Sequence, residues 1–215
     1  NLFSLKDKCA VITGSSRGIG KSIATRFAEY GANVIISSRK IESCEKVVNE
    51  INTNGGKSFA FECNISRKEH CNNLIDFAIS KFKKIDILVC NAASNPYYGK
   101  LAEIPDELFD KIMNNNVKSN LWLCQKALPL MSNNDGGSII IVSSIAGIQG
   151  VKNLGAYSVS KTADIGLIRS LAVEWGEKNI TVNGLCPGII KTDFAKALWD
   201  NPPLLKEVES LAPLG

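Results

Sequence analysis

Thr13-Gly14-Ser15-Ser16-Arg17-Gly18-Ile19-Gly20 joins an apolar run, residues 9–13, to an amphipathic segment, residues 18–30. The apolar run predicts a buried strand and the segment after it a helix. Glycines at such a turn let a pyrophosphate approach the backbone amides and the positive end of the helix. A glycine-rich turn can also simply connect a strand to a helix. At the first strand we expect a dinucleotide site formed by Gly14, Ser16, Arg17, Gly18, Ile19 and Gly20.

The same alternation of strand and helix continues along the chain. We expect further strands at residues 33–37, 58–62, 85–90, 138–142 and 181–185, and further helices at 41–54, 68–82, 106–132 and 156–178. Nearly continuous apolar strands, such as Ile-Ile-Ile-Val at 139–142, are typical of a parallel sheet covered on both faces. The sequence therefore predicts one α/β domain over residues 1–215, a Rossmann-like doubly wound parallel sheet in the order 3-2-1-4-5-6.

Composition narrows the class of protein. The 25 basic and 21 acidic residues are mixed along the chain and leave a net charge of +4, which favours no nucleic-acid partner. No apolar run is long enough to predict a membrane span. The seven cysteines form no Cys-x-x-Cys pair and predict free thiols in the cytoplasm or another reducing compartment. His70 is the only histidine and lies among polar residues, so we expect neither a metal site nor a histidine-based triad.

The end of the second strand bears on the choice of cofactor. A carboxylate there would bind an adenosine ribose and favour NAD, but this chain has Ser37-Ser38-Arg39-Lys40. A hydroxyl followed by a guanidinium suits a 2′-phosphate, with Arg17 as a second cation. We therefore expect NADP(H), bound by Ser38 and Arg39. The alternative is that Arg39 and Lys40 simply face solvent.

Tyr157 and Lys161 are four residues apart, so on a helix the phenol and the ammonium project from one face. An ammonium beside a phenol favours the phenolate and lowers the tyrosine pKa from about 10 towards neutrality. The pair predicts a tyrosine that donates or accepts a proton at cellular pH.

Several motifs together resemble the short-chain dehydrogenase/reductase family, from about Leu5 to the end of the chain. They are the glycine turn, Asn91-Ala92-Ala93, Asn116, Ser144, Tyr157 and Lys161, in this order. The resemblance implies hydride transfer between nicotinamide C4 and a carbonyl or alcohol carbon. It makes Tyr157 the proton donor to the carbonyl oxygen and Ser144 a hydrogen-bond donor to that oxygen. It gives Lys161 contacts with Tyr157 and the nicotinamide ribose, and gives Asn116 a water that links Lys161 to solvent. Alternatively, Ser144 caps a turn and Asn116 satisfies buried backbone.

The resemblance also implies further cofactor contacts. After the third strand the family usually carries an Asp near the adenine, and here Asn64 stands in its place. The family's further cofactor contacts fall on Ile65, Asn91, Ala92, Pro187, Gly188, Ile190 and Thr192. The family continues past Gly215 with another helix and a seventh parallel strand, which we expect to lie outside this sequence.

An aromatic and apolar cleft is the expected substrate site, although core or oligomer packing would explain the same residues. Its members besides Ser144 and Tyr157 are Tyr97, Phe194 and Trp199, with Leu198 and Leu204 as further apolar surface. The chain looks most like the family's NADPH-dependent carbonyl and retinal reductases, which implies an apolar small-molecule carbonyl substrate.

Two other functions fit the same motifs. A 3-oxoacyl-acyl-carrier-protein reductase needs basic surface for its acidic carrier, and Lys152, Lys191 and Lys196 are available. A catalytically silent cofactor-binding or scaffold subunit would be expected to lack Ser144, Tyr157 or Lys161. The resemblance further implies a homodimer or homotetramer, with residues 106–132 and 156–178 at the dimer interface.

Overall fold

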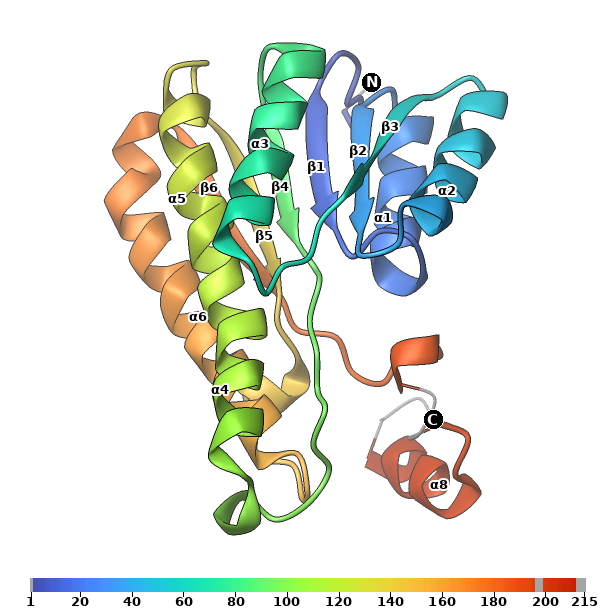
Figure 1. Ribbon diagram of the computed structural model, residues 1–215, viewed down its shortest axis with the longest axis vertical. Helices are drawn as coiled ribbons and strands as arrows, with labels where there is room; N and C mark the ends of the chain where they lie inside the picture. Colours follow the sequence, from blue (N-terminus) through green and yellow to red (C-terminus); the bar gives the residue numbers. More distant parts are fainter. Residues whose placement is uncertain (1, 196–198, 212–215) are drawn as a thin grey trace.

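The computed structural model describes residues 2–195 and 199–211, and in the last helix it leaves the side chains of 204, 207, 208 and 211 undescribed. Its centre is a six-stranded sheet with all neighbouring strands parallel, in the order β3-β2-β1-β4-β5-β6 (Figure 1). This confirms the predicted doubly wound sheet. The strands are β1 (Cys9–Thr13), β2 (Asn33–Ser38), β3 (Lys57–Glu62), β4 (Ile87–Cys90), β5 (Gly137–Val142) and β6 (Ile180–Leu185).

The helices are α1 (Gly18–Glu29), α2 (Ile41–Thr53), α3 (Lys68–Phe82), α4 (Asp106–Met113), α5 (Ser119–Ser132), α6 (Gly155–Trp175) and α8 (Pro202–Leu211). The helices up to α6 lie close to the predicted ranges, whereas the last helix, α8, was not predicted. The single helix expected at 106–132 is wrong in one respect, because a π-helical turn, Asn114–Lys118, separates α4 from α5. The helix expected at 156–178 ends at Trp175 and is followed by a 3-10 turn, after which Asn179 takes a left-handed φ of 57°.

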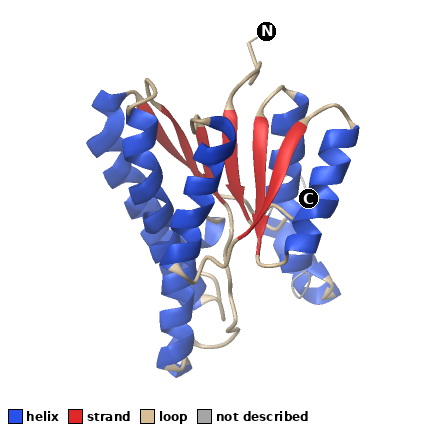
Figure 2. Cartoon of the chain, turned by 45° about the horizontal axis from the view of Figure 1, so that its top comes forward, coloured by secondary structure: helices blue, strands red, loops and turns tan. Residues whose placement is uncertain are grey.

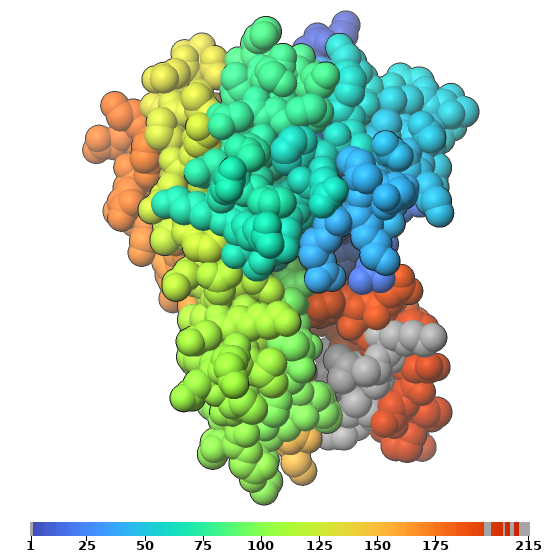
Figure 3. All heavy atoms as spheres, in the orientation of Figure 1, coloured from blue at the N-terminus to red at the C-terminus, as the bar shows by residue number. Residues whose placement is uncertain are grey.

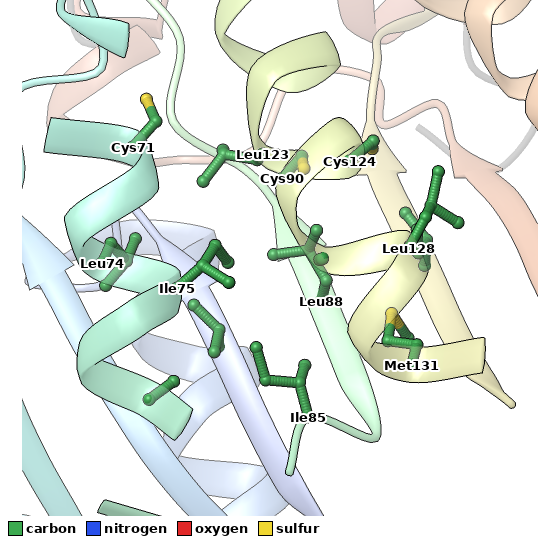
Figure 4. Close-up of a cluster of buried hydrophobic side chains, with 14 of the residues drawn as sticks. Cys71, Leu74, Ile75, Ile85, Leu88, Cys90, Leu123, Cys124, Leu128 and Met131 are labelled. Atoms are coloured by element: carbon green, nitrogen blue, oxygen red, sulfur yellow. The ribbon is translucent and has the colours of Figure 1, made fainter. Parts of the chain in front are cut away.

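Two layers of helices enclose the sheet (Figures 1 and 2). Side chains alternate along β1, so Val11 packs in the cluster formed with α3, α5 and α6, and Ile12 in the cluster formed with α1 and α2. Figure 4 shows the first cluster, in which Leu88 of β4 lies between Ile75 of α3 and Leu128 of α5. These cores fix the carboxyl ends of the strands at one edge, where α/β sheets bind ligands.

Candidate active site

The glycine turn between β1 and α1 is held from the neighbouring strand β4. Gly14 and Gly18 have φ angles of 64° and 56°, a region that favours glycine. A Cβ on Gly20 would lie 2.4 Å from the carbonyl oxygen of Gly14. Asn91, directly after β4, donates from Nδ2 to the carbonyl oxygens of Thr13 (2.9 Å) and Gly14 (3.1 Å). The turn is therefore a tight, fixed backbone, and Asn91 supports it.

The first turn of α1 can accept an anion. Arg17 precedes the helix in an extended conformation and its side chain forms no capping hydrogen bond. The leading amides of a helix have no intrahelical partners, and the helix end carries a partial positive charge. Ser16 is half-buried beside this end and Arg17 is exposed. The turn therefore fits the pyrophosphate of a dinucleotide.

The side chains expected around the adenosine differ in whether they already have hydrogen-bond or ion-pair partners within the protein. Arg39 is exposed, and among the described residues it pairs with no carboxylate. The Ser38 hydroxyl is used locally, since it donates to the carbonyl oxygen of Lys40 (3.2 Å). Asn64 Oδ1 accepts hydrogen bonds from the backbone nitrogen (3.1 Å) and hydroxyl (2.9 Å) of Ser66. The Asn64 side chain therefore shapes a turn and presents only its amide nitrogen to a ligand.

Tyr157 stands in the first turn of α6 with its ring half-buried. Its ring centroid lies 6.4 Å from that of Phe194, whose side chain is exposed. Within the described part of the chain, the Tyr157 hydroxyl has no hydrogen-bond partner. The ring of Tyr157 is thus packed, and its hydroxyl is available to a ligand.

Ser144, in the loop after β5, serves the fold as well. Its Oγ accepts a hydrogen bond from the backbone nitrogen of Ala146 (3.1 Å) and caps the short 3-10 helix Ile145–Gly147. The hydroxyl hydrogen is not used in that bond. Capping and donation to a substrate oxygen are therefore compatible.

Lys161 is buried, with a relative exposure of 1%. Its Nζ donates to the carbonyl oxygen of Val142 and to Oδ2 of Asp164, both at 2.9 Å. Nζ also lies 5.8 Å from the centroid of the Tyr157 ring. The ammonium and the phenol are neighbours, as the spacing predicts, but the ion pair with Asp164 was missed. A carboxylate three residues after Lys161 in the apolar helix α6 was the available signal.

Asn116 lies in the π-helical turn and is fully buried. Its Oδ1 accepts from the backbone nitrogen of Ser94 (2.8 Å), and its Nδ2 donates to the Ser94 carbonyl oxygen and to Ser160 Oγ, both at 3.0 Å. Asn116 thus satisfies buried backbone and fastens the loop after β4 to α6. Irregular turns of this kind are frequent at functional sites.

The loop after β6 reaches across to the glycine turn (Figure 3). Arg17 Nη1 lies 3.4 Å from Asp193 Oδ2, and a Cβ on Gly18 would lie 3.3 Å from Thr192 Cγ2. The carbonyl oxygen of Pro187 accepts a hydrogen bond from the backbone nitrogen of Ile145 (3.0 Å), which connects this loop to the serine loop. Of the other predicted cofactor contacts, Ile65 is buried, Ile19 and Ala92 are half-buried, and Gly188 and Ile190 are exposed.

The predicted substrate residues are only partly brought together. Phe194 lies beside Tyr157, and Trp199 Nε1 donates to the carbonyl oxygen of Thr192 (2.8 Å). The Tyr97 hydroxyl instead donates to the carbonyl oxygen of Lys100 (3.0 Å) and closes its own loop. Lys196 and Leu198 lie outside the described residues, as does the side chain of Leu204.

Comparison with known families matches residues 8–203 to the family described as short chain dehydrogenase. The chain belongs to this family. Membership of the short-chain dehydrogenase family confirms the resemblance seen in the motifs and makes the protein an oxidoreductase. Among the described residues, no helix combines the length and apolarity needed to cross a membrane.

Relatives in the short-chain dehydrogenase family include "Dehydrogenase/reductase SDR family member 4" of Oryctolagus cuniculus. The two are 43% identical over 197 residues, which cover 92% of this chain and 76% of the relative. A solved 7α-hydroxysteroid dehydrogenase, in complex with NADH and 7-oxo glycochenodeoxycholic acid, is 40% identical with a TM-score of 0.91, covering 95% of this chain and 79% of that one. A hydroxysteroid dehydrogenase of Escherichia coli is 38% identical with a TM-score of 0.84, covering 98% and 84%.

Proposed function

We propose that this protein is an NADPH-dependent oxidoreductase that transfers a hydride to the ketone or aldehyde carbonyl of an apolar substrate. The observation that carries the proposal is made at Tyr157. Its hydroxyl has no partner among the described residues, and its ring lies beside exposed Phe194 and buried Lys161. A phenol committed to the interior would not serve this chemistry.

Three side chains have separate roles in the proposed reaction. When bound, the dinucleotide supplies the hydride that adds to the carbonyl carbon. Tyr157 gives its hydroxyl proton to the carbonyl oxygen, which completes the alcohol. Ser144 donates a hydrogen bond to the same oxygen and stabilises the negative charge that develops there. Asn116 holds the loop of Ser94 and thereby the wall of the site.

The Tyr157→Phe variant tests the role of the phenol. It keeps the ring against Phe194 but removes the only proton that we assign to the carbonyl oxygen, so NADPH oxidation should fall by at least about 100-fold. Tyr30→Phe, at the end of α1, is the matched control and should retain wild-type activity. NADPH affinity, measured by fluorescence titration, should change little in both. Equal losses of turnover and of NADPH binding in Tyr157→Phe would contradict the assigned role.

The choice of NADPH over NADH rests on Arg39. Its guanidinium is exposed directly after β2 and, within the described residues, has no carboxylate partner to compete with a 2′-phosphate. The related hydroxysteroid dehydrogenase was solved with NADH, so family membership alone does not select the cofactor.

Replacing Arg39 by Leu should weaken NADPH binding by roughly 10- to 100-fold, the usual worth of charge-assisted hydrogen bonds, and should leave NADH binding nearly unchanged. Lys40→Leu is the matched control, because Lys40 is the adjacent exposed cation. Titrations of both variants with NADPH and NADH give the comparison. An unchanged preference in Arg39→Leu would place the phosphate elsewhere, and an equal loss in Lys40→Leu would show that Arg39 is not its specific contact.

The substrate class follows from the aromatic side of the site. Phe194 lies beside Tyr157, and Trp199 is hydrogen-bonded to Thr192, two residues before Phe194. The related hydroxysteroid dehydrogenase was solved with a ketone on a steroid frame. A screen of NADPH oxidation across diketones, quinones, retinal and acetoacetyl thioesters tests the assignment. Preference for the thioesters would favour the carrier-protein reductase, for which Lys152 and Lys191 are exposed. NADPH binding without oxidation of any substrate would favour the scaffold subunit.

We further propose a homodimer or homotetramer in a reducing compartment such as the cytoplasm. On α6, Val173 and Val159 are 84% and 40% exposed, which offers apolar surface to a second copy. All seven cysteines are free thiols. Sedimentation of the purified protein measures the oligomeric state.

A further inference from the structure

A buried ion pair lies beside Tyr157, and the proposed mechanism gives no role to its carboxylate, Asp164. Lys161 and Asp164 of α6 are 1% and 0% exposed, and Nζ lies 2.9 Å from Oδ2. Removing two charges from water is costly, so a buried pair of this kind needs a reason beyond stability.

The carboxylate is itself held from a second helix. Asp164 Oδ1 accepts a hydrogen bond from Asn120 Nδ2 (2.9 Å), and the same Nδ2 donates to the backbone carbonyl oxygen of Asn116 (2.7 Å). Burial raises the pKa of Asp164 above 3.8, while Lys161 and the Asn120 hydrogen bond act in the opposite direction. The charge of Asp164 therefore depends on Lys161 and Asn120.

The position of the ammonium is equally defined. A lysine ammonium has three N–H donors. Val142 and Asp164 each take one, and within the described residues nothing accepts the third. This donor remains for a group on the Tyr157 side, because Nζ lies 5.8 Å from the centroid of that ring.

We propose that Asp164 is a positioning residue that keeps Lys161 protonated and holds its ammonium beside Tyr157. The inference rests on the proposed role of Tyr157 as proton donor. Burial alone favours a neutral lysine amine, and a carboxylate in hydrogen-bond contact restores the charged form. Without Asp164, the buried amine would lose its proton more readily, and the phenolate of Tyr157 would lose the positive charge that stabilises it.

Other titratable groups near the pair come from β4 and α5. Cys90 ends β4, and its thiol is close enough to Asp164 for the carboxylate to help raise its pKa. The main causes of that increase are a hydrogen bond with Cys124 of α5 and burial, which together place the pKa of Cys90 well above 9.0. Cys90 therefore stays a neutral thiol at neutral pH.

The test is the pH at which the Tyr157 phenolate forms. Ultraviolet absorbance is titrated in the wild type and in Asp164→Asn, and the Tyr157 signal is isolated in each background by subtracting the corresponding Tyr157→Phe protein. In Asp164→Asn the phenolate should form at a pH at least one unit higher, and Asp164→Glu should restore the wild-type midpoint. A midpoint that is unmoved or lower in Asp164→Asn would overturn the proposal, because a merely structural role would change stability and not this midpoint.

A second measurement needs no substitution at 164. The 13C resonance of the Lys161 side chain, assigned with Lys161→Arg, reports its charge in the wild type. We expect an ammonium at pH 7, and a neutral amine there would overturn the proposal even if Asp164→Asn does not fold. Both measurements use neither cofactor nor substrate. A protein that titrates as expected but oxidises no NADPH would contradict the proposed function and leave the role of Asp164 intact.

Discussion

Ser144 and Lys161 each form hydrogen bonds within the fold and keep one hydrogen without a partner among the described residues. The Ser144 oxygen accepts a hydrogen bond from the backbone nitrogen of Ala146, and its hydrogen stays available for the substrate oxygen that we propose it binds. Two donors of the Lys161 ammonium are used inside the fold, and the third is left for the site. Each side chain is thus oriented by bonds that leave free the hydrogen to which we assign a role, as expected for a preorganised site.

Asp86 has a comparable structural role at the opposite edge of the sheet. Its Oδ2 accepts from the backbone nitrogen of Cys9 (2.8 Å), and its carboxylate pairs with Lys84 (3.0 Å) and Lys8 (3.2 Å). The backbone carbonyl oxygen of Asp86 accepts a hydrogen bond from the backbone nitrogen of Ser138 (2.9 Å). Burial acts to raise the pKa of Asp86, but the Cys9 hydrogen bond and the two lysines outweigh it and lower the pKa below 3.8.

Asp86→Asn should therefore lower the free energy of unfolding at pH 7 by about 1–3 kcal/mol, the range for hydrogen bonds to charged groups. Because the folded pKa is below the unfolded value, the wild-type advantage exists above the unfolded pKa and is lost as pH falls through the folded one. Urea unfolding at pH 7 and at pH 3 measures both. Asp76→Asn, which breaks only the exposed pair with Lys126, is the control and should cost less than about 1 kcal/mol. A deficit in Asp86→Asn that persists unchanged at low pH would contradict the charge-based explanation.

At the scale of elements, the glycine turn and the π-helical turn place the site. The turn before α1 is fixed by close backbone packing. The π-helical turn Asn114–Lys118, which lies between α4 and α5, positions Asn116 to accept a hydrogen bond from the backbone nitrogen of Ser94. Hydrophobic periodicity predicts one uninterrupted helix there, since a single extra residue in a turn leaves little trace in the pattern.

Gly20→Ala tests the close packing of the glycine turn. The new Cβ would lie 2.4 Å from the Gly14 carbonyl oxygen and 2.5 Å from Asn91 Nδ2, so the turn must shift. Overpacking of this kind costs about 1–3 kcal/mol, and the moved amides should weaken NADPH binding by roughly 10-fold or more. Thermal unfolding and NADPH titration give the two readouts.

Gly166→Ala, inside α6, is the matched control for that substitution. A Cβ at Gly166 meets no atom within 4 Å, so alanine there should stabilise the protein by about 0.5–1 kcal/mol through helix propensity. Its NADPH affinity should equal that of the wild type. If Gly20→Ala changed stability and NADPH affinity no more than Gly166→Ala does, the glycine turn would not be as tightly packed as the structure indicates.

At the scale of the whole molecule, the strand order decides where these parts meet. The chain runs outward from β1 to β3 and then returns to place β4 on the other side of β1. Connections therefore diverge between β1 and β4, the topological switch point at which such sheets bind ligands. The glycine turn follows β1 and Asn91 follows β4, and their hydrogen bonds cross this point.

From the sequence alone, local periodicity and backbone propensity predicted most element boundaries and the glycine turn, and spacing along one helix predicted the Tyr157–Lys161 pair. The strand order was expected from the alternation of strands and helices, and Ser144 only from the resemblance to the family's motifs. Only the tertiary structure decided which side chains pair through hydrogen bonds and ion pairs. Asn120 meets Asp164 across 44 residues, and Arg17 meets Asp193 across 176. Whether a carboxylate is a buried counter-ion or a solvated surface charge depends on what packs over it, and that is a property of the folded core and not of any segment.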